Sequence, residues 1–232
     1  GLSGLGRLLA FQPAKELAGA LGELKSLAAV AKTSAVRRLC YGALISAVGN
    51  GDDAYLQAST SKDGLRDFLA AVSRIPEEDV RSRLYSKVRI LVSGLPPGLK
   101  SEAGDEKIHD LAIETLGTIP GHGKEKFSDL TTRLKAGRNR SAAITVLRNI
   151  PREDWIKEQV RPLVDNLVGY LSEIPASERN SDTAVAAFFL TVKLAQALPS
   201  EQAREVQSRL RNLDVRIIAI GTVPHRMIYD QE

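Results

Sequence analysis

The sequence is poor in the residues that carry most metal and thiol chemistry. Among its 232 residues are one cysteine, three histidines and one tryptophan, and aromatic residues make up only 5%. The single Cys40 cannot form a disulfide within the chain or a thiolate metal cage, and three scattered histidines disfavour a multi-histidine metal site. With 43% hydrophobic residues and so few rings, the core is expected to consist of Ala, Leu, Val and Ile. Such a composition favours helices over sheets.

Long apolar runs and a dominant charge are also missing. No stretch of 18 residues is apolar throughout, so no membrane-spanning segment is predicted. Lysine and arginine exceed aspartate and glutamate by 32 − 28 = 4. The two signs are interspersed, unlike the basic stripe of a dedicated nucleic-acid-binding protein. The chain starts at Gly1 without a readable signal peptide, and we expect it to be a fragment of a longer protein.

Hydrophobic residues at steps of three and four predict a series of amphipathic helices over residues 1–213. The segment Ser93–Gly104 contains two adjacent prolines and three glycines, so it is predicted to be a loop and an internal break of this domain. Ser34 and Asp105 are expected to cap helices, Gly49 to end one, and Pro162 to kink one or split off its first turn. About ten helices are expected, at 13–32, 34–48, 62–74, 77–92, 105–116, 124–135, 139–149, 153–173, 182–197 and 201–212, with a short piece at 53–58.

One pattern recurs where these helices end: an aliphatic residue followed by proline. It is present at Ile75-Pro76, Ile119-Pro120, Ile150-Pro151, Ile174-Pro175 and Leu198-Pro199. Proline ends one helix and its fixed φ can start the next, while the preceding aliphatic side chain packs on a neighbour. Stacked antiparallel helices at such spacings are typical of an all-α solenoid of the HEAT or armadillo kind. A compact bundle with proline-marked helix ends is the alternative.

Residues 214–232 break with the helical pattern. Val215, Ile217, Ile218 and Ile220 form a short β-branched run before Gly221, which favours a strand. A lone strand cannot satisfy its own backbone hydrogen bonds, so partners are expected beyond Glu232.

The polar residues that suggest chemistry are weak candidates. His109 lies beside Asp110 without a second histidine or an activated serine at helical spacing, and Gly121-His122-Gly123-Lys124 lacks the residues of a phosphate-binding loop. Cys40 is expected to be a buried small hydrophobe and Trp155 an anchor against a neighbouring helix. Asn139-Arg140-Ser141 has the spacing of a glycosylation sequon, and Lys135, Arg138, Arg140 and Arg148 form one local basic cluster. We assign no catalytic, cofactor-binding or metal-ligating residue.

The second half of the chain resembles a known group of proteins. The stretch NIPREDWIKEQVRPLVDNLVGYLSEIPASERN, continued to LDVRIIAIGTVPHRMIYDQE, is similar to the HEAT-like region of planctomycete-type multidomain dehydrogenase and cytochrome proteins. The similarity covers residues 150–232 and is most specific at 221–230. It implies that residues 214–232 open a plastocyanin- or azurin-like (cupredoxin) domain, and that the parent is an exported, periplasmic or envelope-associated protein with copper and haem c. The chain has no Cys-x-x-Cys-His, and His225 and Met227 match the entry segment rather than the copper ligands, so no ligand is assigned here.

Three hypotheses follow from the sequence. The leading one is a non-catalytic helical scaffold that spaces the redox domains of the parent or offers its concave face to a protein partner. The second is a stand-alone protein-interaction solenoid. The third and weakest is nucleic-acid binding through the cluster that includes Lys135 and Arg148, which would make DNA retention sensitive to salt.

Overall fold

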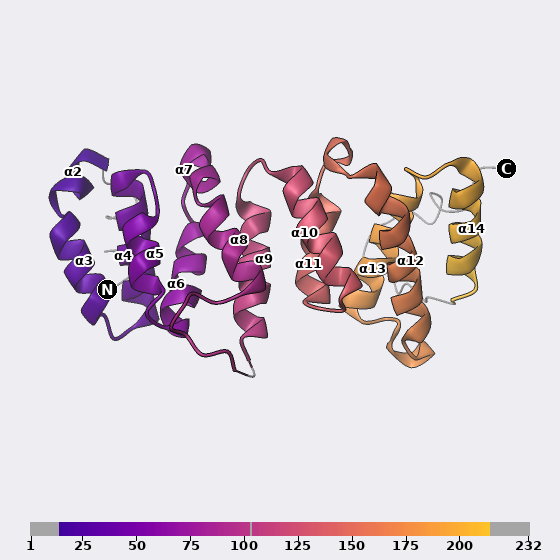
Figure 1. Cartoon of the computed structure of the whole chain (residues 1–232), viewed down its shortest axis with the longest axis horizontal. Helices are drawn as coiled ribbons and strands as arrows, with labels where there is room; N and C mark the ends of the chain where they lie inside the picture. The colour runs from indigo at the N-terminus through magenta and orange to yellow at the C-terminus, as the bar shows by residue number, and fades with distance from the viewer. Residues whose placement is uncertain (1–13, 103, 214–232) are drawn as a thin grey trace. The chain divides into compact units, whose positions relative to one another are not determined.

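The computed structural model describes residues 14–102 and 104–213 (Figure 1). These residues are all helical, as predicted, with 13 α-helices, two short 3-10 turns and no strand among them. They fall into two compact units, one ending at Trp155 and the other beginning at Ile156. The strand predicted within 214–232 lies outside the described residues, as do His225 and Met227.

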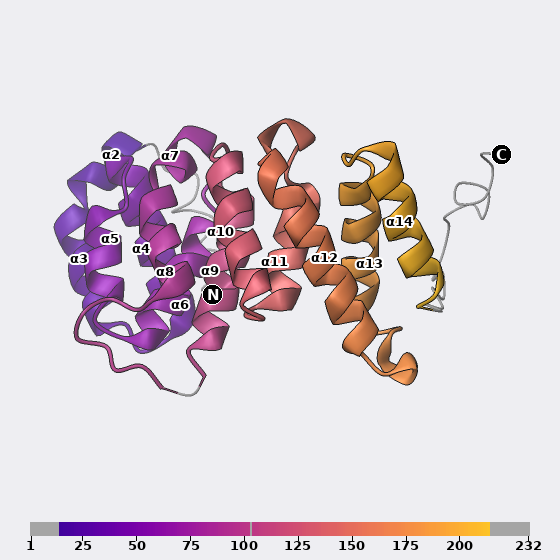
Figure 2. The same ribbon diagram turned by 45° about the vertical axis from the view of Figure 1, so that its right-hand side comes forward.

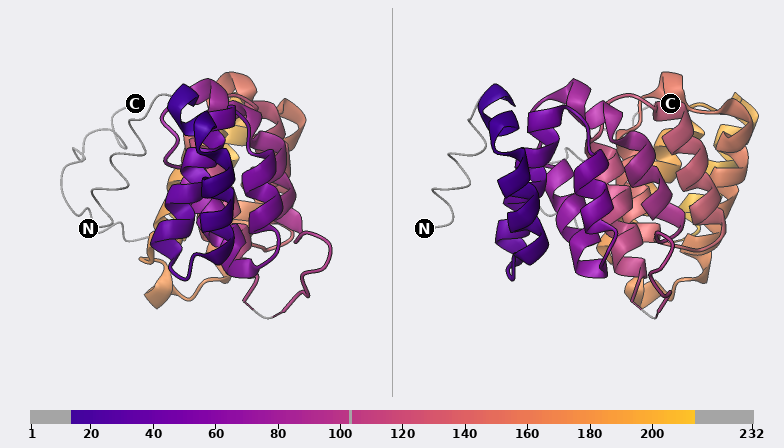
Figure 3. Two further views of the ribbon diagram at one scale, coloured as in Figure 1. Left: turned by 90° about the vertical axis from the view of Figure 1, so that its left-hand side faces the viewer. Right: turned by 60° about the vertical axis from the view of Figure 1, so that its left-hand side comes forward.

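The first unit contains ten α-helices and ends in a 3-10 turn. The predicted loop Ser93–Gly104 connects α8 to α9, except that Ser93 is the last residue of α8, and its described part reaches beyond the ends of the helices (Figure 3). The elements are α2 (Ala14–Gly19), α3 (Leu21–Val30), α4 (Ser34–Val48), α5 (Asp52–Ala58), α6 (Lys62–Val72), α7 (Glu78–Arg83), α8 (Tyr85–Ser93), α9 (Glu106–Thr118), α10 (Gly123–Lys135), α11 (Arg140–Asn149) and η1 (Arg152–Asp154).

Two predicted long helices are each broken, which accounts for most of the excess over the expected ten. The helix predicted at 13–32 is interrupted at Ala20, between Gly19 and Gly22, where the helix propensity is low. The helix predicted at 77–92 breaks at Leu84, whose N–H bonds to the carbonyl of Arg81 at 2.9 Å in a tighter, three-residue step. The short piece expected at 53–58 forms α5.

The helices of the first unit pack in two rows. In one row α4, α6, α9 and α11 contact each other in that order. In the other, α3, α5, α8 and α10 each pack on the following helix of the first row, so that the chain alternates between rows (Figures 1 and 2). The core is mostly aliphatic as expected, with Phe68 and Phe127 as its largest fully buried side chains.

Helix ends follow local rules in α4 and α6. Thr33, one residue before the predicted Ser34, caps α4 by accepting the Val36 N–H at 3.4 Å, and Gly49 ends the helix in the left-handed conformation at φ 71°. Ser61 caps α6 by accepting the Gly64 N–H at 3.0 Å. The large apolar residues of α6, at steps of three and four around Phe68, are all buried.

Two apolar residues near helix ends are partly exposed. Leu27, in the last turn of α3, and Val48, the last residue of α4, are each 42% exposed. Asp105 precedes α9, as predicted, but its side chain does not cap that helix.

The second unit contains three α-helices and one 3-10 turn. The helix predicted at 153–173 begins only at Lys157 and then continues through Pro162. Pro162 removes the ladder hydrogen bond to the Glu158 carbonyl, yet the helix is unbroken from Lys157 to Glu173. Helix α13 contacts both α12 and α14, and α12 contacts α14. The elements are α12 (Lys157–Glu173), η2 (Ala176–Glu178), α13 (Asp182–Ala195) and α14 (Ser200–Arg211).

Candidate functional site

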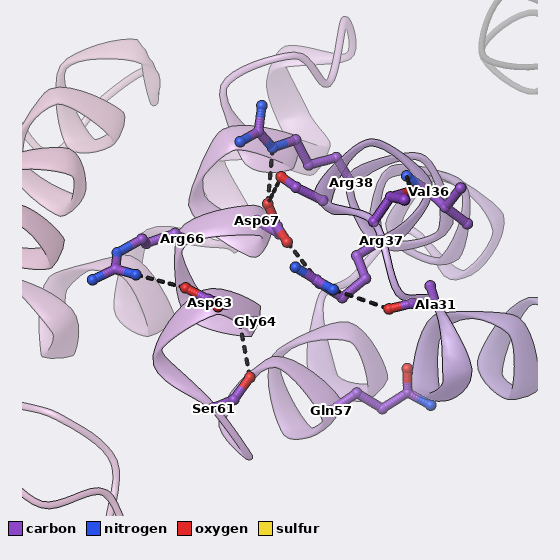
Figure 4. Close-up of polar contacts among 12 residues, drawn as sticks. Ala31, Val36, Arg37, Arg38, Gln57, Ser61, Asp63, Gly64, Arg66 and Asp67 are labelled. Carbon is purple, nitrogen blue, oxygen red and sulfur yellow. Dashed lines mark hydrogen bonds and ion pairs between the residues drawn. The ribbon is translucent and has the colours of Figure 1, made fainter. Parts of the chain in front are cut away.

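The most concentrated polar site is a buried aspartate between α4 and α6 (Figure 4). Asp67 is 2% exposed. Its Oδ2 accepts the Arg37 Nε–H at 2.7 Å, and its Oδ1 accepts the Arg38 Nε–H at 2.9 Å and the Ser34 hydroxyl. Arg37 also donates from Nη1 to the Ala31 carbonyl at 2.9 Å, which ties the loop before α4 to the same site. We call Ser34, Arg37, Arg38 and Asp67 the Asp67 cluster.

The Asp67 cluster is suited to holding helices together rather than to catalysis. Both oxygens of the Asp67 carboxylate are occupied, Oδ2 by Arg37 and Oδ1 by Arg38 and the Ser34 hydroxyl. A serine nucleophile needs a base that can take its proton, and the partners of this carboxylate are a hydroxyl and two cations. The arrangement therefore fixes α4 against α6 with charge-assisted hydrogen bonds.

The same row of helices is bridged at its next two contacts. Between α6 and α9, the Lys62 ammonium lies 2.7 Å from Asp105 and 3.0 Å from Glu102. The Lys62 hydrogen bond lowers the pKa of the Asp105 carboxyl. Asp105 also accepts the Glu102 N–H at 2.7 Å, so its side chain holds the loop before α9 instead of capping the helix.

The α9–α11 contact is bridged by Asn139, in the left-handed conformation at φ 51°. Its amide nitrogen donates to Glu106 Oε2 and to Asp110 Oδ1, both at 2.8 Å, while its oxygen accepts from the Arg133 guanidinium, with Nε at 3.1 Å. Burial lowers the pKa of Arg133. The sequon nitrogen is thus fully engaged, and Asn139 acts as a structural bridge rather than as an accessible glycan acceptor.

Helices of the other row are joined by ion pairs. Each pair links consecutive members of the row: α3 to α5, α5 to α8, and α8 to α10. The last is bidentate, with Arg89 Nε and Nη2 at 2.6 and 2.9 Å from the Asp129 oxygens. The other two are Lys25–Asp53 at 2.8 Å and Lys87–Asp52 at 2.6 Å. Each step along both rows therefore carries at least one polar bridge.

The aliphatic–proline turns share a hydrogen bond that the sequence pattern did not reveal. At four of them, a side-chain N–H five to seven residues later donates to the carbonyl of the aliphatic residue. The proline that follows holds the aliphatic residue in an extended conformation, as at Ile119, Ile150 and Ile174, whose ψ angles are 127°, 128° and 131°. The carbonyl is thereby turned away from the helix and is free to accept. The pairs are Arg81 to Ile75, Lys126 to Ile119, Trp155 to Ile150 at 3.1 Å and Arg179 to Ile174 at 3.0 Å.

Two of these donors, Lys126 and Trp155, have buried side chains. Lys126 is 6% exposed, and burial lowers the pKa of its ammonium, partly offset by Asp154. Trp155 packs its ring on Phe127 at 6.2 Å between centroids, which confirms it as an anchor against a neighbouring helix. Both side chains serve the turn and the core at once.

The histidines singled out from the sequence do not assemble an acid–base site. His109 donates from Nδ1 to the Leu91 carbonyl at 2.7 Å, while the neighbouring Asp110 is held by Asn139. His122 stacks on the Tyr85 ring with centroids 3.8 Å apart and an interplanar angle of 2°. No proton path connects these groups to a nucleophile among the contacts described.

The remaining candidates are also placed by the fold. Cys40 is buried in α4, and burial raises the pKa of its thiol, as for an unreactive small hydrophobe. The basic cluster divides, because Lys135, Arg138 and Arg140 surround the α10–α11 turn, whereas Arg148 lies eight residues further along α11, about 12 Å away along the axis.

Within 14–102 and 104–213, no group of three potential metal-ligating side chains is present. In the same part of the chain, no helix combines the length and apolar character needed to cross a bilayer.

Sequence reasoning missed the Asp67 cluster entirely. The other three members precede Asp67 by 29 to 33 residues in the sequence, and the Arg-Arg dipeptide of α4 carries no signal that distinguishes a helix bridge from a solvated face.

Comparisons of the chain with protein-family models, with curated proteins and with solved structures gave no match in any of the three.

Proposed function

We propose that the chain is a HEAT-like α-solenoid that acts as a non-catalytic scaffold and interaction segment. The observation that carries this proposal is the two-row packing of the first unit, in which each helix pair contacts the next and each step is bridged by polar side chains. Stability in such an array is a sum over neighbouring repeats, so bridges at every step make a stiff spacer. Four of the five aliphatic–proline turns are closed by a side-chain donor, which supports a repeated structural unit.

We further propose that the scaffold belongs to a larger exported redox protein and leads at residues 214–232 into the first strand of a cupredoxin-like domain. This part rests on the resemblance of residues 150–232 and on the β-branched run that begins at Val215. Its mechanism is geometric: a stiff array fixes the distance between haem and copper domains, or offers its concave face to a protein partner. Catalysis, by this proposal, belongs to other domains of the parent, a dehydrogenase-type oxidoreductase.

The stiffness of the first unit can be measured by distances between spin labels. Val30 on α3 and Thr145 on α11 are exposed and lie near opposite ends of the unit, so Val30→Cys and Thr145→Cys provide labelling sites in a Cys40→Ala background. A rigid scaffold predicts a single narrow distance distribution. A broad or multimodal distribution for the folded protein would refute the scaffold role.

The redox assignment has a separate test. The open reading frame that contains this chain would be expressed with export to the periplasm, and its copper content and visible absorption measured. One copper per chain with a thiolate-to-copper absorption band is expected. A full reading frame that folds without binding copper would remove the redox assignment and leave the stand-alone interaction solenoid.

A further inference from the structure

The last helix of the second unit is attached by little apolar surface. Helix α14 has 12 residues, of which Val206 and Leu210 are buried, and Leu213, two residues after its end, is buried as well. Helix α13, of similar length, buries six residues. Elements with few buried apolar contacts open at lower free energy than the rest of a protein. Polar contacts therefore contribute to the position of α14 beside these few apolar ones.

Four charged side chains supply these contacts. Arg161 of α12 donates through both terminal nitrogens to the Glu205 carboxylate of α14, at 3.0 Å each, and through Nε to Asp165 at 2.8 Å. Arg209 donates to Asp165 at 2.8 Å and lies 3.8 Å from Glu205. Each helix contributes one acid and one base four residues apart, so every charge has opposite charges on both helices. We call these four residues the α12–α14 charge cluster.

The α12–α14 charge cluster is accessible to solvent, with its side chains 30% to 50% exposed. Ions and protons can therefore compete for it. Helix α13 brings only two ionisable residues, Asp182 in its first turn and Lys193 in its last. Arg179, after η2, donates to the Leu213 carbonyl and holds the end of α14.

Acid acts on the same contacts in a defined direction. Arg161 lowers the pKa of Glu205, and for Asp165 the hydrogen bonds from Arg161 and Arg209 outweigh burial, which alone would raise its pKa. Both pKa values are lower in the folded state than in the unfolded one. The stability that Asp165 and Glu205 contribute is therefore complete above their ordinary pKa values of 3.8 and 4.5 and is lost as pH falls below them. Near neutral pH the effective competitor is salt.

We propose that α14 is a charge-held clasp that detaches from α12 and α13 as a unit while those two helices stay paired. The effect of this detachment on the spacing between domains rests on the scaffold function proposed above. A detached helix of this length is marginal in water, so its 12 residues span about 18 Å while helical and up to about 40 Å once they unfold. Detachment thus lengthens the link to whatever follows Leu213.

Hydrogen exchange on the full chain tests the clasp. Exchange of α14 amides at pH 7 is expected to rise about tenfold between low salt and ~1 M NaCl, and similarly in Glu205→Gln, with α13 amides unchanged. Asp129→Asn, which breaks the bidentate pair of Arg89 in the first unit, is the matched control and should leave α14 unaffected. The double variant Arg161→Glu with Glu205→Arg, which reverses the charges of this pair, should restore much of the protection of the α14 amides.

Two outcomes would overturn the clasp. One is exchange of α14 in step with α12 and α13 under all conditions, which would make the second unit a single cooperative block. The other is α14 protection that neither salt nor Glu205→Gln changes. Neither result bears on the spin-label distances in the first unit, so failure of the clasp and failure of the scaffold can be told apart.

Discussion

Removing the Asp67 carboxylate should be among the most damaging single changes in the first unit. In Asp67→Ala, the guanidinium groups of Arg37 and Arg38 lose their shared counter-charge, and their side chains are only 20% and 38% exposed. Breaking a buried ion pair from one side costs about 3–5 kcal/mol, because the remaining charge is left unpaired. Since Arg38 reaches solvent, we expect the lower end, about 3 kcal/mol, or a fall in Tm of roughly 6–12 °C.

The assay is urea unfolding followed by circular dichroism, with hydrogen exchange of α4 and α6 to assign the transition to the first unit. Asp129→Asn is the control, because its partner Arg89 is 48% exposed and a surface pair contributes at most about 1 kcal/mol. The triple change Arg37→Met, Arg38→Met and Asp67→Leu removes all three charges together. It should recover most of the loss, since a well-packed apolar replacement of a buried ion cluster is close to neutral.

Two results would refute this reasoning. If the free energy of unfolding of Asp67→Ala is within ~0.5 kcal/mol of that of the unsubstituted chain, the cluster does not hold α4 on α6. If the triple apolar variant is as unstable as Asp67→Ala, the loss comes from packing volume and not from the unpaired cations.

Three further predictions concern local geometry. Gly64→Ala would place a methyl 2.6 Å from the Ala58 carbonyl oxygen and should cost about 1–3 kcal/mol, whereas Gly169→Ala, which meets no atom within 4 Å, should stabilise α12 by about 0.5–1 kcal/mol in the same unfolding assay. Burial raises the pKa of Tyr85 to about 12 from 10.0, so its contribution to stability is complete below pH 10 and is lost as pH rises toward 12. Absorbance at 295 nm should show that Tyr85→Phe removes a tyrosine that ionises near pH 12, and loss of one that ionises near 10 would contradict this. Asn139→Ala should destabilise by about 1–2 kcal/mol, because it removes a left-handed asparagine and the bridge between α9 and α11, and an unchanged midpoint would show that the bridge is dispensable.

Periodicity and proline predicted where helices lie better than where they break. The inward residues of α6 follow a stripe centred on Phe68, and burial of such a stripe is a local property that can be read from spacing. The breaks at Ala20 and Leu84 were missed, because Leu17 and Leu24, or Val80 and Val88, continue the apolar pattern across them. An apolar stripe whose spacing continues across two helices therefore does not indicate that the chain changes direction between them.

The polar bridges were beyond sequence reasoning for a different reason. Ser34 was expected to cap α4, yet Thr33 takes that role and the Ser34 hydroxyl turns to Asp67. Which of two neighbouring hydroxyls caps a helix depends on what the other can reach, and that depends on the position of α6. The same holds for Asp105, whose carboxylate is drawn to Lys62 and away from its own helix.

The hydrogen bond that closes four of the aliphatic–proline turns has a consequence for how such a chain can change in length. Donor and acceptor lie within seven residues of each other. At Ile150 and Ile174 the donor precedes the next α-helix, so a helix copied together with its turn brings both groups along. At the other two turns the donor lies in the following helix, so only a copy that includes that helix keeps the carbonyl paired.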